Sequence, residues 1–239
     1  MSIAEKFETI ADAVYEKGYS DGCETVSLAH WNAITLNGTR EKWNGKDGYS
    51  PFMVTDYSNI KFPKPILITG DATRLFRSYK GEYLPRKEDI DMTGVTSAAE
   101  MFSYIYGNGC KTIPDYGIPA LGGYYQTYAF AQDVYTIELI RCNENTTFNA
   151  AFTSCSNLKN VTFEGIIGKS INLSWSPLSV ESMKNVIAHL KDYSEDADSI
   201  GKNTLAFSDD SWESLEASGA APDGDTWENY VIKLGWLIG

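Results

Sequence analysis

Two short stretches of the chain have the outline of catalytic motifs. Residues 18–22 (GYSDG) match the G-x-S-x-G pattern, in which a strand precedes the serine and a helix follows it. Here helical patterns lie on both sides of Ser20. Residues 165–170 (GIIGKS) are two residues shorter than a phosphate-binding P-loop, and residues 171–173 favour a strand where that loop needs a helix. We therefore expect that neither Ser20 nor Lys169 carries catalysis.

Metal chemistry has few candidate ligands in this sequence. The chain has two histidines, His30 and His189, and no C-x-x-C pair, which is too little for a regular zinc site. The acidic loops at 195–198 and 223–225 lack EF-hand spacing and are typical of solvated loops that bind calcium weakly at most. We predict no cofactor, no metal and no enzymatic activity. The cysteines are predicted to be free, mostly buried thiols: Cys23, Cys110, Cys142 and Cys155.

Tyrosine is the residue type that hints at a binding surface. Its rigid apolar ring and polar tip suit contacts with sugars or proteins. The same rings could instead fill the core of the fold in place of leucine, and the sequence leaves both interpretations open. Seven tyrosines form the candidate binding cluster: Tyr104, Tyr106, Tyr116, Tyr124, Tyr125, Tyr128 and Tyr135.

A repeat organises the part of the chain that holds these tyrosines. Four helical-looking segments, at 72–78, 97–103, 126–131 and 148–154, each set a small or apolar residue before a phenylalanine. A short alternating stretch follows each segment. A helical turn plus a strand every 20–30 residues is typical of a leucine-rich-repeat-like solenoid. The predicted fold is α/β, an irregular leucine-rich-repeat-like solenoid over residues 51–239, with Phe102, Phe130 and Phe152 buried at equivalent positions of successive turns.

Longer elements follow the repeat. Residues 179–191 have an amphipathic helical pattern, residues 204–207 a strand pattern and residues 226–234 a second helical pattern. We expect these larger units to cap the C-terminal end of the solenoid.

The first 50 residues differ from the rest. Ile3, Phe7, Ile10 and Val14 are spaced four, three and four residues apart, which is an a/d seam on a helix. We predict that residues 1–50 form a helical oligomerisation or docking segment with these four side chains at the interface, a trimer being favoured. In the alternative, the stripe packs on residues 23–36 of its own chain and the protein is a monomer.

Overall composition limits the classes of partner. The 239 residues carry a net charge of −12, which argues against nucleic-acid binding. No run of 18 apolar residues predicts a membrane-spanning helix, and residues 1–7 lack the features of a signal peptide. We therefore expect a protein made in the cytoplasm, with neither nucleic acid nor membrane insertion.

The order of motifs resembles a known group of proteins. Residues 151–163 (AFTSCSNLKNVTF) resemble the irregular leucine-rich repeats of bacterial surface proteins. That unit, the stretch 10–18, the stretch 31–40 (WNAITLNGTR), the stretch 161–168 (VTFEGIIG) and the stretch 175–178 (WSPL) together resemble phage and prophage minor structural proteins encoded among tail genes.

This resemblance implies a non-enzymatic structural or binding component of the virion, associated with tail or baseplate and able to contact a receptor on the host. The implied partners are other virion proteins and a host-surface glycan or protein. The resemblance brings no catalytic residues. Two alternatives stay open, a bacterial leucine-rich-repeat adhesin that binds a protein or glycan, and a glycan-cleaving tail enzyme.

Overall fold

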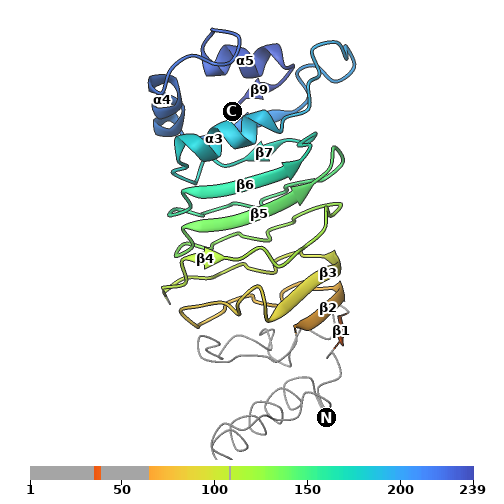
Figure 1. Ribbon diagram of the computed structural model, residues 1–239. Coiled ribbons are helices and arrows are strands. Elements are labelled where there is room, and N and C mark those ends of the chain that lie inside the picture. Colours follow the sequence, from red (N-terminus) through yellow and green to blue (C-terminus); the bar gives the residue numbers. More distant parts are fainter. Residues whose placement is uncertain (1–34, 39–64, 108) are drawn as a thin grey trace, which may run out of the picture.

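The chain folds into a parallel β-solenoid of about four turns, which the computed structural model describes over residues 35–38, 65–107 and 109–239 (Figure 1). Along one side of the column, the strands form two parallel three-stranded sheets, one after the other. Those strands are β1 (Thr35–Gly38), β2 (Ile66–Asp71), β3 (Ile90–Ser97), β4 (Thr112–Ile113), β5 (Thr136–Cys142) and β6 (Asn160–Gly165). Along β6, and along β5 except at the irregularity between Ile137 and Ile140, buried residues alternate with more exposed ones, so one face of the sheet lines the core.

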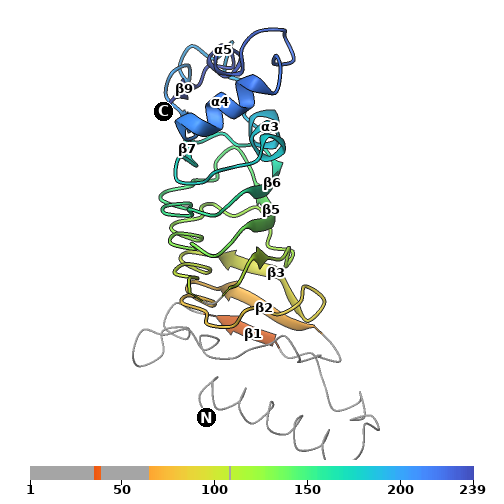
Figure 2. The ribbon, with the colours of Figure 1, turned by 90° about the vertical axis from the view of Figure 1, so that its left-hand side faces the viewer.

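The second side of the solenoid is a ladder of turns at residues 72–79, 98–105, 124–131 and 148–155, the stacked loops of Figure 2. The N–H of Phe76 donates to the carbonyl of Met101 at 2.9 Å, and the N–H of Phe102 donates to that of Thr127 at 2.8 Å. The intervening N–H groups bond three residues back along the chain. The backbone is therefore paired both within each turn and between turns, as buried polar groups require.

The helical-looking segments of the sequence are not helices, and that prediction was wrong. Two residues in each turn of the ladder have a left-handed backbone, and a left-handed residue ends a right-handed helix. The core is a parallel β-solenoid, and among the described residues the α-helices lie only in the C-terminal part. The left-handed residues are Arg74, Ser78, Glu100, Tyr104, Gln126, Phe130, Ala150 and Ser154, with φ between 49° and 66°.

A column of aromatic rings fills the solenoid behind the turn ladder. The rings of Phe76, Phe102, Tyr128 and Phe152 stack in order, with centroids 5.5, 5.9 and 5.5 Å apart. Burial of Phe102 and Phe152 confirms that part of the prediction. Phe130 was placed wrongly: it is only half-buried, and Tyr128 occupies the core position. Tyr128 follows Phe102 by 26 residues and occupies the equivalent core position one turn later. Phe130 follows Tyr104 by the same 26 residues and therefore occupies the equivalent outward-facing position.

Longer units follow the repeated turns at the C-terminal end. Helix α3 (Val180–Ala188) covers β6, where Ser182 Oγ accepts from the N–H of Val161 at 2.9 Å and Asn185 Oδ1 from the N–H of Phe163 at 2.7 Å. These side chains accept hydrogen bonds from backbone N–H groups of β6, the last strand of its sheet, which would otherwise be an open edge. The remaining elements are β7 (Ile171–Asn172), β8 (Thr204–Ala206), α4 (Asp209–Ala217), α5 (Trp227–Lys233) and β9 (Leu237–Ile238).

Apart from residues 35–38, which form strand β1 within the predicted helical segment 1–50, the N-terminal predictions concern residues outside the described part of the chain. These are the helices of segment 1–50, the interface of Ile3, Phe7, Ile10 and Val14, the Ser20 motif, His30 and Cys23. In the ranges 35–38, 65–107 and 109–239, no helix has the length and apolar character needed to cross a membrane.

The three described cysteines are free and buried, as predicted. Burial raises the pKa of the Cys110 and Cys142 thiols to about 11 and that of Cys155 to about 12. Because the thiolate is the reactive species, we expect all three to resist Ellman's reagent at neutral pH in the folded protein and to react in urea. Peptide mapping after pulse alkylation checks this. Rapid labelling of any of the three in the native protein would contradict the burial.

Candidate binding surface

The seven candidate tyrosines divide between core and surface. Tyr116, Tyr124 and Tyr128 are buried. The hydroxyl of Tyr124 donates to the carbonyl of Arg141 at 2.8 Å, and burial raises the pKa of all three phenols. The other four lie at the surface, with Tyr104 half-buried and Tyr106, Tyr125 and Tyr135 exposed by 46%, 51% and 40%. The structure therefore does not bring the seven into one cluster.

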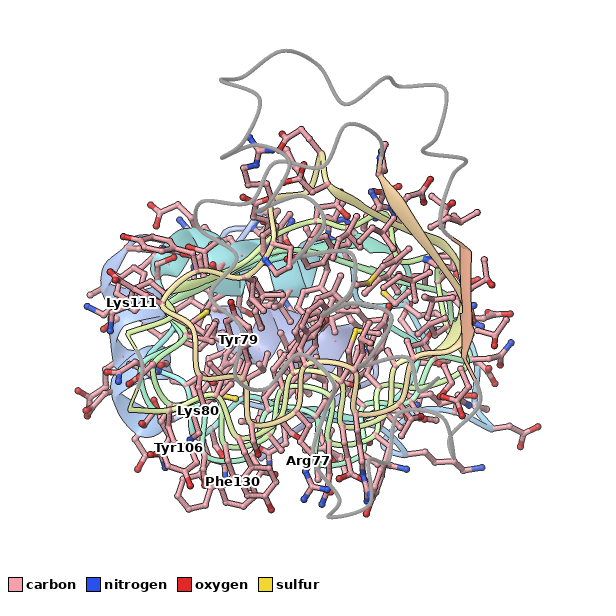
Figure 3. The ribbon with its side chains drawn as sticks, turned by 90° about the horizontal axis from the view of Figure 1, so that it is seen from below. Arg77, Tyr79, Lys80, Tyr106, Lys111 and Phe130 are labelled. Carbon is pink, nitrogen blue, oxygen red and sulfur yellow. The ribbon has the colours of Figure 1, made fainter. Side chains whose placement is uncertain are left out.

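Most of the surface tyrosines lie among basic side chains along one edge of the solenoid. Viewed down the axis, Arg77, Lys80, Tyr106, Lys111 and Phe130 point outward along one part of the outline, whereas Tyr79 points inward (Figure 3). We call this surface the aromatic–basic rim. Its members are Arg77, Lys80, Tyr104, Tyr106, Lys111, Phe130, Tyr135 and Lys159.

The first column of the rim lies on the turn ladder. The rings of Tyr104 and Phe130 stack with centroids 4.8 Å apart and planes 15° apart. Both residues have φ near 60° at equivalent positions, so their side chains leave the backbone in the same direction one turn apart. The Arg77 guanidinium lies 5.0 Å from the centroid of the Tyr104 ring, within cation–π range. Rings stacked along the axis present their edges, where the ring quadrupole is positive, toward solvent.

The second column lies at the corner between the turn ladder and the sheet. The N–H of Tyr135 donates to the carbonyl of Lys111 at 2.8 Å, and that of Lys159 donates to the carbonyl of Tyr135 at 3.0 Å. These bonds align Lys111, Tyr135 and Lys159 on three successive turns. The ammonium of Lys159 lies 5.5 Å from the Tyr135 ring centroid, and that of Lys80 lies 5.1 Å from the Tyr106 ring.

The rim carries more positive than negative charge. Glu100, which is 7% exposed, binds Arg74 at 2.9 Å and Arg77 at 3.2 Å, so it neutralises part of the arginine charge. Asp133 accepts from the N–H of Gly109 at 3.0 Å. Among the described residues, no ion pair joins a carboxylate to the other three cations, Lys80, Lys111 and Lys159.

The outer face of the sheet has the opposite character. Arg141 binds both carboxylate oxygens of Asp115, at 2.7 and 2.8 Å, and its Nε lies 3.4 Å from Glu164. The hydrogen bonds from the guanidinium lower the pKa of Asp115. With Asp91 and Glu138 on the same face, acidic residues outnumber the one arginine. The net charge of −12 is therefore unevenly distributed, and the rim is a basic region of an acidic protein.

The motif-like segments in the described part occupy ordinary structural positions. A strand, β7, follows residues 165–170 as predicted. His189 ends α3, with Nδ1 2.7 Å from the carbonyl oxygen of Asn185. In the acidic loop at 223–225, both aspartates contact the ammonium of Lys233, at 2.7 and 2.8 Å. Within the described ranges, no group of three or more His, Cys, Asp or Glu side chains is placed to hold a metal.

Sequence reasoning missed the basic half of the rim. It also missed Phe130 as a surface residue. The signal was present, because Lys111, Tyr135 and Lys159 are 24 residues apart and therefore recur at the period of the turns.

Comparison with known proteins adds no relative to this description. No protein-family model, no curated protein and no solved structure matches the chain.

Proposed function

We propose that the protein is a non-enzymatic binding and structural component of a phage particle, associated with the tail or baseplate, whose aromatic–basic rim contacts the host surface. The phage assignment rests on the resemblance of the motif order. The rim supports the binding role. The protein is made in the host cytoplasm, takes its place among other virion proteins and needs no cofactor.

The observation that carries the binding role is the alignment of like side chains on successive turns. Tyr104 lies above Phe130, and Lys111, Tyr135 and Lys159 follow one another. The backbone beneath them is hydrogen-bonded from turn to turn, so the side chains start from fixed positions. A surface fixed in this way loses less entropy when it binds than a mobile loop does. Exposed aromatic rings and arginine are also the residue types enriched at binding sites.

Localisation of the protein tests the phage assignment. An antibody raised against it should label tails in purified particles, and peptides of the protein should be found in those particles by mass spectrometry. Protein found on the bacterial surface and missing from particles would support the adhesin alternative and reject the phage assignment. Tail labelling together with hydrolysis of host glycan by the pure protein would support the enzymatic alternative.

A further inference from the structure

We propose that the aromatic–basic rim binds an acidic polysaccharide that runs along the solenoid axis, its carboxylates pairing with Lys80, Lys111 and Lys159. This inference rests on the proposed function to the extent that the rim is taken as the ligand-binding surface. It adds the chemical class of the ligand.

The charge of the ligand follows from the lysines. Lys80 and Lys159 lie over tyrosine rings, which attract an ammonium group without neutralising it. Each ammonium keeps donors for an anion, and hydrogen bonds between charged partners are about twice as strong as neutral ones. The outward ring edges of Tyr104 and Phe130 also favour negative charge over positive.

The polymeric form of the ligand follows from the repeat. Lys111, Tyr135 and Lys159 recur once per turn, at the spacing of about 4.8 Å that separates paired strands. A ligand that repeats along its length meets a lysine at every second turn of this corner, with a tyrosine between the two lysines. Several weak contacts on one chain then add up by raising the effective concentration at each neighbouring site.

A peptide is a poorer match for this surface. An extended peptide gains affinity by adding a strand to an open sheet edge. At the corner of the rim, the N–H groups of Tyr135, Lys159 and Ser179 already donate to the preceding turn. A ligand must therefore bind through side chains. The hydroxyl of Tyr135 and the side-chain amide of the exposed Gln132 supply donors and acceptors for sugar hydroxyls. The exposed Asn157 donates from Nδ2 to the carbonyl of Gln132 at 2.6 Å and keeps its Oδ1 as an acceptor.

Binding of defined polymers to the whole protein tests the inference. The probes are polygalacturonate, alginate and hyaluronate, together with the methyl ester of polygalacturonate, in which the same sugar chain has lost its charge. Poly-glutamate supplies carboxylates without sugar. We expect binding to at least one acidic polysaccharide, weakened by salt, and at least about tenfold weaker binding to the methyl ester and to poly-glutamate.

A pair of variants locates the site. Lys111→Gln/Lys159→Gln should lower the affinity for the bound polysaccharide about tenfold. Lys169→Gln/Lys202→Gln removes the same charge from exposed lysines outside the rim and should leave the affinity unchanged. Circular dichroism of both variants checks that the fold is kept.

Three results would overturn the inference. They are binding to none of the acidic polysaccharides, equal binding to the methyl ester or poly-glutamate, and equal loss in the two double variants. Each leaves the tail-labelling result standing, so failure of the ligand class is distinguishable from failure of the phage assignment. Missing tail labels together with rim-dependent binding would reject the phage assignment alone.

Discussion

Replacing Phe152 with alanine is expected to lower the free energy of unfolding by about 3–5 kcal/mol. The ring is 1% exposed and stacks on Tyr128 at 5.5 Å, with Phe163 against its edge at 6.3 Å. Stacked backbone holds these neighbours in place, so they cannot collapse into the cavity that the substitution leaves. Urea unfolding followed by tryptophan fluorescence gives the change, provided that the denaturant dependence of the wild-type and variant proteins is the same.

Phe130→Ala is the matched control for this experiment. It removes the same number of atoms from a ring that is half-buried on the outside of the turn ladder. Its main contact is the stack with Tyr104, which is worth about 0.5–1.5 kcal/mol beyond burial. We expect a much smaller loss of stability than for Phe152→Ala. Equal losses would mean that Phe130 and Phe152 occupy equivalent positions, as the sequence alone predicts, and that the register of the third turn is wrong.

The repeat could be predicted from sequence because the core of a solenoid imposes it. Each turn must supply inward side chains at fixed places, and Phe76, Phe102 and Phe152 mark those places. The C-terminal units could be predicted for a related reason. In α3 the buried residues Met183, Val186 and Ile187 follow the helical period, and Ser179 caps the helix.

The conformation of the repeated segments could not be predicted in the same way. Ala72, Leu75, Phe76 and Tyr79 are buried at i, i+3, i+4 and i+7, which is also the pattern of one helix face. A ladder of turns with a left-handed residue at every fourth position buries the same set. Glycine usually marks left-handed backbone, but here arginine, serine, glutamate and tyrosine adopt it. The strain of roughly 1–2 kcal/mol for each such residue is offset by hydrogen bonds to the next turn, which a sequence does not reveal.

Which of the tyrosines are buried could not be predicted from the sequence either. Tyr124 and Tyr125 are neighbours with the same side chain, yet one is buried and the other is half exposed to solvent. Whether each ring is buried or exposed depends on the register of the turn, which is set by pairing with residues more than 20 positions away. The N–H of Tyr124 donates to the carbonyl of Thr147 at 2.8 Å. Composition therefore gives the number of tyrosines, but only the structure shows which of them reach the surface.

Replacing Gly165 with alanine is expected to destabilise the protein by about 3 kcal/mol or more. The residue has φ 102°, which alone costs a side-chain-bearing residue about 1–3 kcal/mol. A Cβ there would also overlap the carbonyl oxygen of Cys142, which faces it across the β5–β6 pair. The obstacle is backbone inside a sheet, so the overlap is relieved only by moving β5 and β6 apart. The same urea experiment measures the loss.

Gly219→Ala separates the cost of the left-handed backbone from the cost of the steric overlap. Gly219 has φ 112°, close to that of Gly165, but no atom lies within 4 Å of where its Cβ would be. This variant should therefore lose only the conformational part, about 1–3 kcal/mol. The difference between the two variants measures how tightly β6 lies against β5 where the last strand of the sheet ends. If both variants lost the same stability, the close approach of Gly165 to Cys142 would be absent, and the solenoid would be looser at this end than its hydrogen bonds indicate.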